Sequence, residues 1–305
     1  MFKSLRFVLA LSLSVLVLPL MSATSGATTR GPQCIVSLSP TATETLFAIG
    51  AGPQVQAVDK DSNYPTTGLP TKRIDSLNPS VESIIGICKI SKTHATRKPD
   101  LVVISYDANS IKAKLTTLGV KVLEQDAPST ISMAYRQILQ LGKLTGHLAK
   151  ASSIVQSLQR TVAADTSSMP SHPGKTLTAY YELDPTFYSL TSATFVGSLM
   201  KSLGIVNIAD AKSTTADFGY PQLSSEYIVS ANPKLIFLAD TVCCGASATT
   251  VAARPGFSSV SAVASGEVIG LNDDVASRWG PRLSQLMNAL TAAVKGALKN
   301  SKLWQ

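Results

Sequence analysis

A chain of 305 residues with 45% apolar residues can bury a full core, and its length suggests about two domains. Its formal net charge of +8 comes from basic residues scattered along the sequence, a distribution that does not suggest a nucleic-acid partner. A basic wall could still attract an anionic small molecule.

The N-terminus has the pattern of a secretory signal peptide. Lys3 and Arg6 precede an apolar run over residues 7–20, and small residues follow it as far as Ala27. The run is shorter than the roughly 20 residues of a transmembrane helix. We therefore expect residues 1–27 to be removed, with cleavage near Ala27 and export to the periplasm or the extracellular space. No cysteine directly follows the apolar run, so no lipid-anchor cysteine is expected.

The four cysteines are Cys34, Cys88, Cys243 and Cys244, and an exported chain carries them into an oxidising compartment. One or two disulfides are predicted, but the sequence does not select among the possible pairings. Neither the cysteine spacing nor the three scattered histidines is typical of a metal site, so no metal and no cofactor is expected.

Two parts of the chain alternate short β-branched strands with helices. Strands are predicted at 34–38, 55–58, 101–105, 120–124, 177–182, 235–239 and 268–271. Helices are predicted between them, and this alternation is typical of a mostly parallel α/β sheet. Because the pattern restarts after residue 175, the sequence predicts two α/β lobes, over 28–129 and 167–305.

Apolar residues recur at helical spacing between Ile131 and Val162. They predict one long α-helix over 130–166 that joins the lobes. About 30 helical residues span roughly 45 Å and would hold the lobes at a fixed separation. Gly142 and Gly146 could soften the centre of this helix.

An internal repeat relates the two lobes. In each, a Ser-capped helix with an early glutamate leads to a Pro-led apolar strand, and the glutamates are Glu82 and Glu226. Capping and the helix dipole explain each carboxylate singly, but their matched positions suggest docking to basic sockets on a partner. The first lobe carries an insert around 88–97. Because α/β proteins usually bind ligands at the carboxyl ends of their strands, and the insert is expected at the opposite edge of the sheet, it should lie away from the ligand.

Candidate ligand contacts follow predicted strands. Pro40 and Thr41 open a helix directly after the first strand, where backbone N–H groups suit a polar ligand, although Thr41 could simply cap that helix. Arg278 precedes the last helix and is a candidate donor to ligand oxygens, or else pairs with Asp274 to order the turn. Aromatic residues suited to a large planar ligand are Tyr64, Tyr106, Tyr181, Phe187, Phe218, Tyr220 and Trp279, each of which could also be a local packing residue.

Motifs of common enzymes are missing from the sequence. There is no Gly-x-Ser-x-Gly and no His-Glu-x-x-His, and Gly50-x-Gly52 follows a predicted helix instead of a strand. An enzyme is therefore not expected.

Taken together, the stretches 34–52, 61–65, 142–146 and 277–283 and the two repeated helix–strand units resemble the helix-linked periplasmic binding proteins of ABC importers for cobalamin, haem and iron-siderophores. The resemblance implies an α/β fold of two Rossmann-like lobes joined by one long α-helix, with the ligand between the lobes. It also implies that Glu82 and Glu226 dock on the permease. Tyr220, Asp274 and Arg278 match positions typical of the cobalamin binders.

We therefore expect the substrate-binding component of an ABC importer, a monomer that captures a corrinoid, ferric siderophore or haem. Its partners would be an ABC permease dimer with its ATPase subunits. An exported carrier or sensor without its own transporter, and an exported enzyme on this scaffold, are the alternatives.

Overall fold

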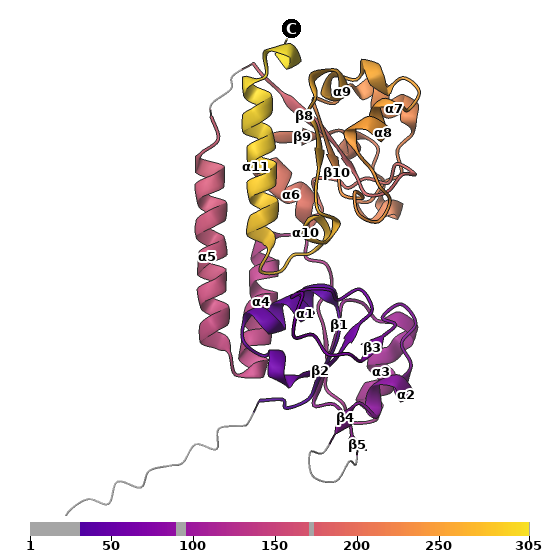
Figure 1. Cartoon of the computed structure of the whole chain (residues 1–305), viewed down its shortest axis with the longest axis vertical. Coiled ribbons are helices and arrows are strands. Elements are labelled where there is room, and N and C mark those ends of the chain that lie inside the picture. Colours follow the sequence, from indigo (N-terminus) through magenta and orange to yellow (C-terminus); the bar gives the residue numbers. More distant parts are fainter. Residues whose placement is uncertain (1–30, 90–95, 171–173, 305) are drawn as a thin grey trace, which may run out of the picture. The chain divides into compact units, whose positions relative to one another are not determined.

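The structure is a computed structural model that describes residues 31–89, 96–170 and 174–304. Two parallel sheets organise this part of the chain (Figure 1). The predicted signal peptide lies outside the described residues.

The first sheet has the order β3-β2-β1-β6-β7, and every neighbouring pair is parallel. Its strands are β1 (Ile35–Leu38), β2 (Val55–Asp59), β3 (Arg73–Ile74), β6 (Leu101–Ile104) and β7 (Val122–Glu124). Helices α1 (Pro40–Ala48), α2 (Val81–Ile85) and α3 (Ile111–Thr117) connect them. Every residue of β1 and β6 is buried, as expected of strands covered on both faces.

The second sheet has the order β11-β10-β8-β9 and is also parallel. Its strands are β8 (Leu177–Glu182), β9 (Ile205–Asn207), β10 (Leu235–Leu238) and β11 (Val268–Gly270). Its helices are α6 (Phe195–Ser202), α7 (Ser225–Ala231), α8 (Ala248–Ala252), α9 (Ser261–Ser265), α10 (Asp273–Ser277) and α11 (Leu283–Lys299). The prediction of two α/β lobes is confirmed.

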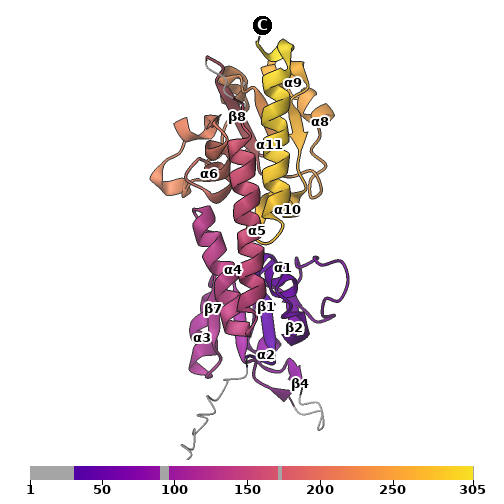
Figure 2. The ribbon, with the colours of Figure 1, turned by 90° about the vertical axis from the view of Figure 1, so that its left-hand side faces the viewer.

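The predicted continuous helix over 130–166 is wrong in one respect, because the chain turns back in its middle. It forms α4 (Ile131–Thr145) and α5 (Leu148–Ser167), which pack side by side (Figure 2). Gly146 adopts a left-handed conformation with φ of 82° and ends α4. Gly142 permits close packing at this turn, since a Cβ there would lie 2.4 Å from the Cβ of Ala151. The long helix that runs between the lobes is α5, which also packs against α11.

Two disulfides account for all four cysteines. Cys34, just before β1, is bonded to Cys88, and both are buried. Cys88 begins β4 (Cys88–Lys89), which pairs antiparallel with β5 (Thr96–Arg97); these strands are the described ends of the insert. Through Cys34 these ends are tied to the amino side of β1, the side predicted for the insert. Cys243 is bonded to its neighbour Cys244.

Among the described residues, no helix is long and apolar enough to span a bilayer.

A pair of glycine substitutions tests the turn between α4 and α5. Gly142→Ala should lower the free energy of unfolding by about 1–3 kcal/mol, because the added methyl group overpacks the contact with Ala151. Gly296→Ala is the matched control. Gly296 lies inside α11 with open space around its Cβ position, so alanine should raise that free energy by about 0.5–1 kcal/mol. Urea unfolding of both variants measures the changes, and equal stability of the two would contradict the close contact.

Candidate functional site

The carboxyl ends of the strands in the two sheets face each other. Within a parallel sheet these ends share one edge, here called the carboxyl edge. Helix α1, with Glu44, follows β1 in the first lobe, and Arg278 follows β11 and α10 in the second. Arg278 Nη1 donates to Glu44 Oε1 at 2.7 Å, so this contact joins the two carboxyl edges. Figure 1 shows the end of α10 close to α1 at this junction.

An ion cluster centred on the buried residues Glu44 and Arg278, here called the Glu44 cluster, surrounds that contact. It consists of Glu44, Asn63, Asp274, Arg278 and Arg282. Glu44 is 2% exposed and also accepts from Arg282 Nε at 2.9 Å. This hydrogen bond raises the pKa of the Arg282 guanidinium above its ordinary value. Two guanidinium groups of the second lobe therefore share one carboxylate of the first.

Arg278 has partners within the protein on both terminal nitrogens. Nη1 also donates to Asn63 Oδ1 at 2.8 Å, and Nη2 donates to the carbonyl of Asp61 at 3.0 Å and to Asp274 Oδ1 at 2.5 Å. Asn63 Nδ2 in turn donates to Asp274 Oδ2 at 2.8 Å. The structure thus brings Asp274 and Arg278 together, and their contacts favour joining the lobes over holding a ligand directly.

Four of the predicted aromatic contacts are exposed on carboxyl-edge loops. Tyr64 follows β2 and Tyr106 follows β6, with 39% and 45% of each residue exposed. Phe218 and Tyr220 follow β9, at 87% and 40%. The Arg282 guanidinium lies 4.3 Å from the centre of the Tyr64 ring and so links this aromatic residue to the Glu44 cluster. Both lobes therefore offer aromatic surface at the edges that face each other.

Three other predicted aromatic contacts serve in packing. Tyr181 is fully buried in β8 beside Phe237, so its prediction as a wall residue is wrong; in a strand covered on both faces, its side chain enters the core. Phe187 is half-buried and stacks on Phe257. Trp279 is half-buried, and its Nε1 donates to Gln137 Oε1 of α4 at 2.7 Å.

At the start of α1, Pro40 is half-buried and Thr41 is buried. The helix is capped by Ser39, whose hydroxyl accepts from the backbone N–H of Ala42, so the interpretation of Thr41 as the cap is wrong. Thr41 instead lies beside Gly280 of the second lobe, at the junction between the lobes.

Sequence reasoning missed the roles of Glu44 and Arg282. The only hint was that both are charged residues within the quoted stretches around 34–52 and 277–283. It also missed a buried cluster behind the second carboxyl edge, in which Arg254 donates to both oxygens of Glu182, at 2.5 and 2.7 Å. Burial, followed by the nearby charge of Glu182, raises the pKa of Asp240 to about 6.

Glu82 and Glu226 occupy equivalent places in the two lobes. Both are exposed in the first turns of α2 and α7, behind the caps Ser80 and Ser224. The backbone N–H of Glu226 and the hydroxyl of Ser224 lower the pKa of the Glu226 carboxyl, which keeps it ionised. The repeat predicted from sequence is therefore present as two capped, exposed carboxylates.

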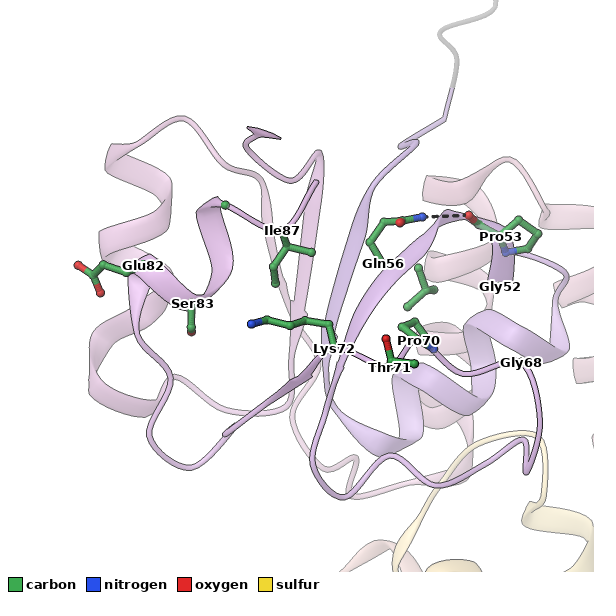
Figure 3. Close-up of a pocket in the computed structure, with 12 residues that line it drawn as sticks. Gly52, Pro53, Gln56, Gly68, Pro70, Thr71, Lys72, Glu82, Ser83 and Ile87 are labelled. Atoms are coloured by element: carbon green, nitrogen blue, oxygen red, sulfur yellow. Dashed lines mark hydrogen bonds between the residues drawn. The ribbon is translucent and has the colours of Figure 1, made fainter. Parts of the chain in front are cut away.

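A groove of about 820 Å³ lies beside Glu82 (Figure 3). Its lining includes Gln56 at the start of β2 and Lys72 just before β3, so it opens toward the amino side of these strands. Lys72 extends toward α2, whereas the Glu82 carboxylate points away from Lys72 (Figure 3). The groove is thus distinct from the carboxyl edge, where the predicted ligand contacts lie.

Within the part of the chain that the structure describes, no group of three or more His, Cys, Asp or Glu side chains is arranged to hold a metal ion.

Comparison with known proteins places these features in one family. The model of the periplasmic binding protein family matches residues 35–275. An uncharacterised ABC transporter substrate-binding lipoprotein of Bacillus subtilis (strain 168) is 28% identical over 274 residues, which cover 87% of this chain and 81% of the relative. A cobalamin-binding protein of Halobacterium salinarum (strain ATCC 29341 / DSM 671 / R1) is 28% identical over 269 residues, covering 86% and 69%.

Two solved structures show the same fold. The periplasmic vitamin B12-binding protein of Vibrio cholerae aligns with a TM-score of 0.71 and 22% identity, covering 88% of this chain and 99% of that one. The periplasmic haem-binding protein of Roseiflexus sp. RS-1, in its apo form, aligns with a TM-score of 0.73 and 20% identity, covering 88% and 100%.

Removing the shared carboxylate tests the Glu44 cluster. Glu44→Gln should lower the free energy of unfolding by about 3–5 kcal/mol, because it leaves two buried guanidinium groups without their common counter-charge. Glu124→Gln, which breaks the more exposed pair with Lys112, should change stability little. Chemical denaturation compares the two variants, and a Glu44 variant as stable as the native protein would show that the cluster does not join the lobes.

Proposed function

Because the chain belongs to the periplasmic binding protein family, we propose that it is the substrate-binding component of an ABC importer. It captures a corrinoid or ferric-siderophore-like ligand between its two lobes and delivers it to a membrane permease. Like its relatives, it is a binding protein rather than an enzyme. The observation that carries the proposal is the pair of facing carboxyl edges, each with exposed aromatic residues.

The chemistry of these edges favours a corrinoid over an anionic ferric complex. Binding a strongly anionic ligand calls for free guanidinium or ammonium groups. Arg278 and Arg282 instead bond to Glu44 and its neighbours, and Arg282 also lies over Tyr64. Aromatic rings remain as the main exposed contacts, and they suit the apolar parts of a large macrocycle. The cobalamin-binding relative points in the same direction.

Delivery would use Glu82 and Glu226, the exposed and equivalent carboxylates of the two lobes. An ABC permease dimer with its ATPase subunits would receive one carboxylate from each lobe of a monomeric binding protein. Two exposed anionic points on a firmly joined pair of lobes suit basic sockets with a fixed spacing.

Export follows from the predicted signal peptide over residues 1–27, and the protein would act in the periplasm or outside the cell. The Bacillus relative is a lipoprotein. In this chain Cys34 is bonded to Cys88, so the Cys34 thiol is not available for lipid attachment.

A ligand screen tests the proposal. Cyanocobalamin at 100 times its dissociation constant should raise the free energy of unfolding of the purified mature protein by about 2.7 kcal/mol. Haemin and ferric desferrioxamine B are the comparison ligands. Tyr220→Ala should weaken binding about tenfold, the loss expected of an aromatic residue that becomes buried against the ligand. Leu118→Ala, equally exposed at 40% but at the C-terminal cap of α3, should not weaken it. Failure of all three ligands to bind would refute the proposed ligand class.

An uptake assay in cells distinguishes docking on the permease from binding of the ligand. The double variant Glu82→Gln, Glu226→Gln should bind ligand with native affinity but support no uptake in cells that depend on this protein, because the carboxylates lie outside the ligand contacts. Asp126→Asn, another exposed acidic position in the first lobe, is the control and should leave uptake intact. Native uptake by the double variant would favour a carrier or sensor that does not dock through these residues.

A further inference from the structure

The second disulfide joins neighbouring residues at an exposed turn. Cys243 and Cys244 lie in the loop that follows β10, and both are exposed. Val242 beside them is 71% exposed. Neighbouring cysteines close almost no loop in the unfolded chain, so their bond adds little to overall stability, unlike that between Cys34 and Cys88, which are 54 residues apart. Its effect is therefore on the local shape of the turn.

Hydrogen bonds fix this turn on the side facing α10. The backbone N–H groups of Val242 and Cys243 both donate to the carboxylate of Asp273, with the bond from Cys243 at 2.7 Å. Thr241 Oγ1 donates to the carbonyl of Leu271 at 2.6 Å. Asp273 precedes Asp274 of the Glu44 cluster, so the turn stands directly beside the junction between the lobes.

A second set of bonds fixes the base of the turn. The backbone N–H groups of Cys244 and Ala246 both donate to the carbonyl of Asp240, at 3.2 and 3.3 Å. Asp240 itself is fully buried behind the carboxyl edge. The turn is thus held in one conformation by hydrogen bonds at both ends and by a covalent bond at its tip.

The turn continues a series of exposed apolar groups along the second carboxyl edge. In the sheet order β11-β10-β8-β9, the loop after β10 carries Val242 and the two cysteines, and the loop after β8 carries Tyr188, which is 42% exposed. The loop after β9 carries Phe218 and Tyr220. Sulfur is polarizable and packs well against aromatic and apolar surfaces. A surface that is already rigid also loses little conformational entropy when a ligand binds.

We propose that Val242 and the Cys243–Cys244 disulfide form a preformed apolar contact for the face of a macrocyclic ligand, and that they help to determine which ligand this protein accepts. The inference rests on the proposed function. It adds a specific contact in the second lobe, beside the junction between the lobes.

Binding measurements on the mature protein test the contact. The double variant Cys243→Ser, Cys244→Ser should bind cyanocobalamin or haemin, whichever the native protein binds, with a Kd about tenfold higher, equivalent to about 1.4 kcal/mol. Its melting temperature should stay close to the native value. Trypsin should release residues 235–278 from the native protein as one peptide, because the Arg254–Pro255 bond resists cleavage, and iodoacetamide should label that peptide only after reduction.

Two control variants separate this effect from a general loss of structure. Cys34→Ala with Cys88→Ala should lower the melting temperature but leave Kd unchanged, and Val206→Ser, an exposed apolar position on β9, should alter neither. Val242→Ser keeps the disulfide and should raise Kd about threefold. If the variant with Cys243→Ser and Cys244→Ser does not fold, the Kd of Val242→Ser tests the contact in its place. Native affinity in both turn variants would overturn the inference. A native protein that binds neither probe would refute the proposed ligand class and this inference with it.

Discussion

The arrangement of the two lobes depends on one buried carboxylate, Glu44, shared between the guanidinium groups of Arg278 and Arg282. Burial of charge is tolerable only when every group is paired, and Asp274 supplies the second negative charge that two guanidinium groups require. A partly broken cluster would leave an unpaired charge away from water. The junction is therefore stable when it is complete, which favours a single relative position of the lobes in the native protein.

This junction also determines what remains for a ligand. The arginines nearest the facing carboxyl edges have partners within the protein, and Arg282 also lies against Tyr64. In the proposed function, contacts with a ligand would be left to exposed aromatic rings, to Val242 and to the disulfide of neighbouring cysteines. Such a surface discriminates mainly by shape and apolar area, because it offers few free charges. In the proposed function, the same residues that hold the lobes together would thus bias the site toward a large, weakly charged ligand.

The sequence predicted the sheets well because each buried strand is a short apolar run bounded by turn residues, and β1, β6 and β10 follow that rule. It predicted a continuous helix because the apolar positions of α4 and α5 keep one helical phase across the break; only Gly142 and Gly146 indicated a weak point there. Tyr181 could not be assigned to a face because both faces of β8 are buried. The partnership of Glu44 with Arg278 spans 234 positions and leaves no local pattern.

The proposed docking residues also depend on the junction between the lobes. Glu82 and Glu226 lie on separate lobes, so their separation is fixed only as firmly as the lobes are joined. Helices α5 and α11 pack together along the connection, and the Glu44 cluster closes it at the carboxyl edges. A pair of carboxylates held in this way can meet two basic sockets at once without first losing the freedom of a hinge. Ligand capture and docking would then both depend on one junction, even though the residues that perform them lie on different loops and helices.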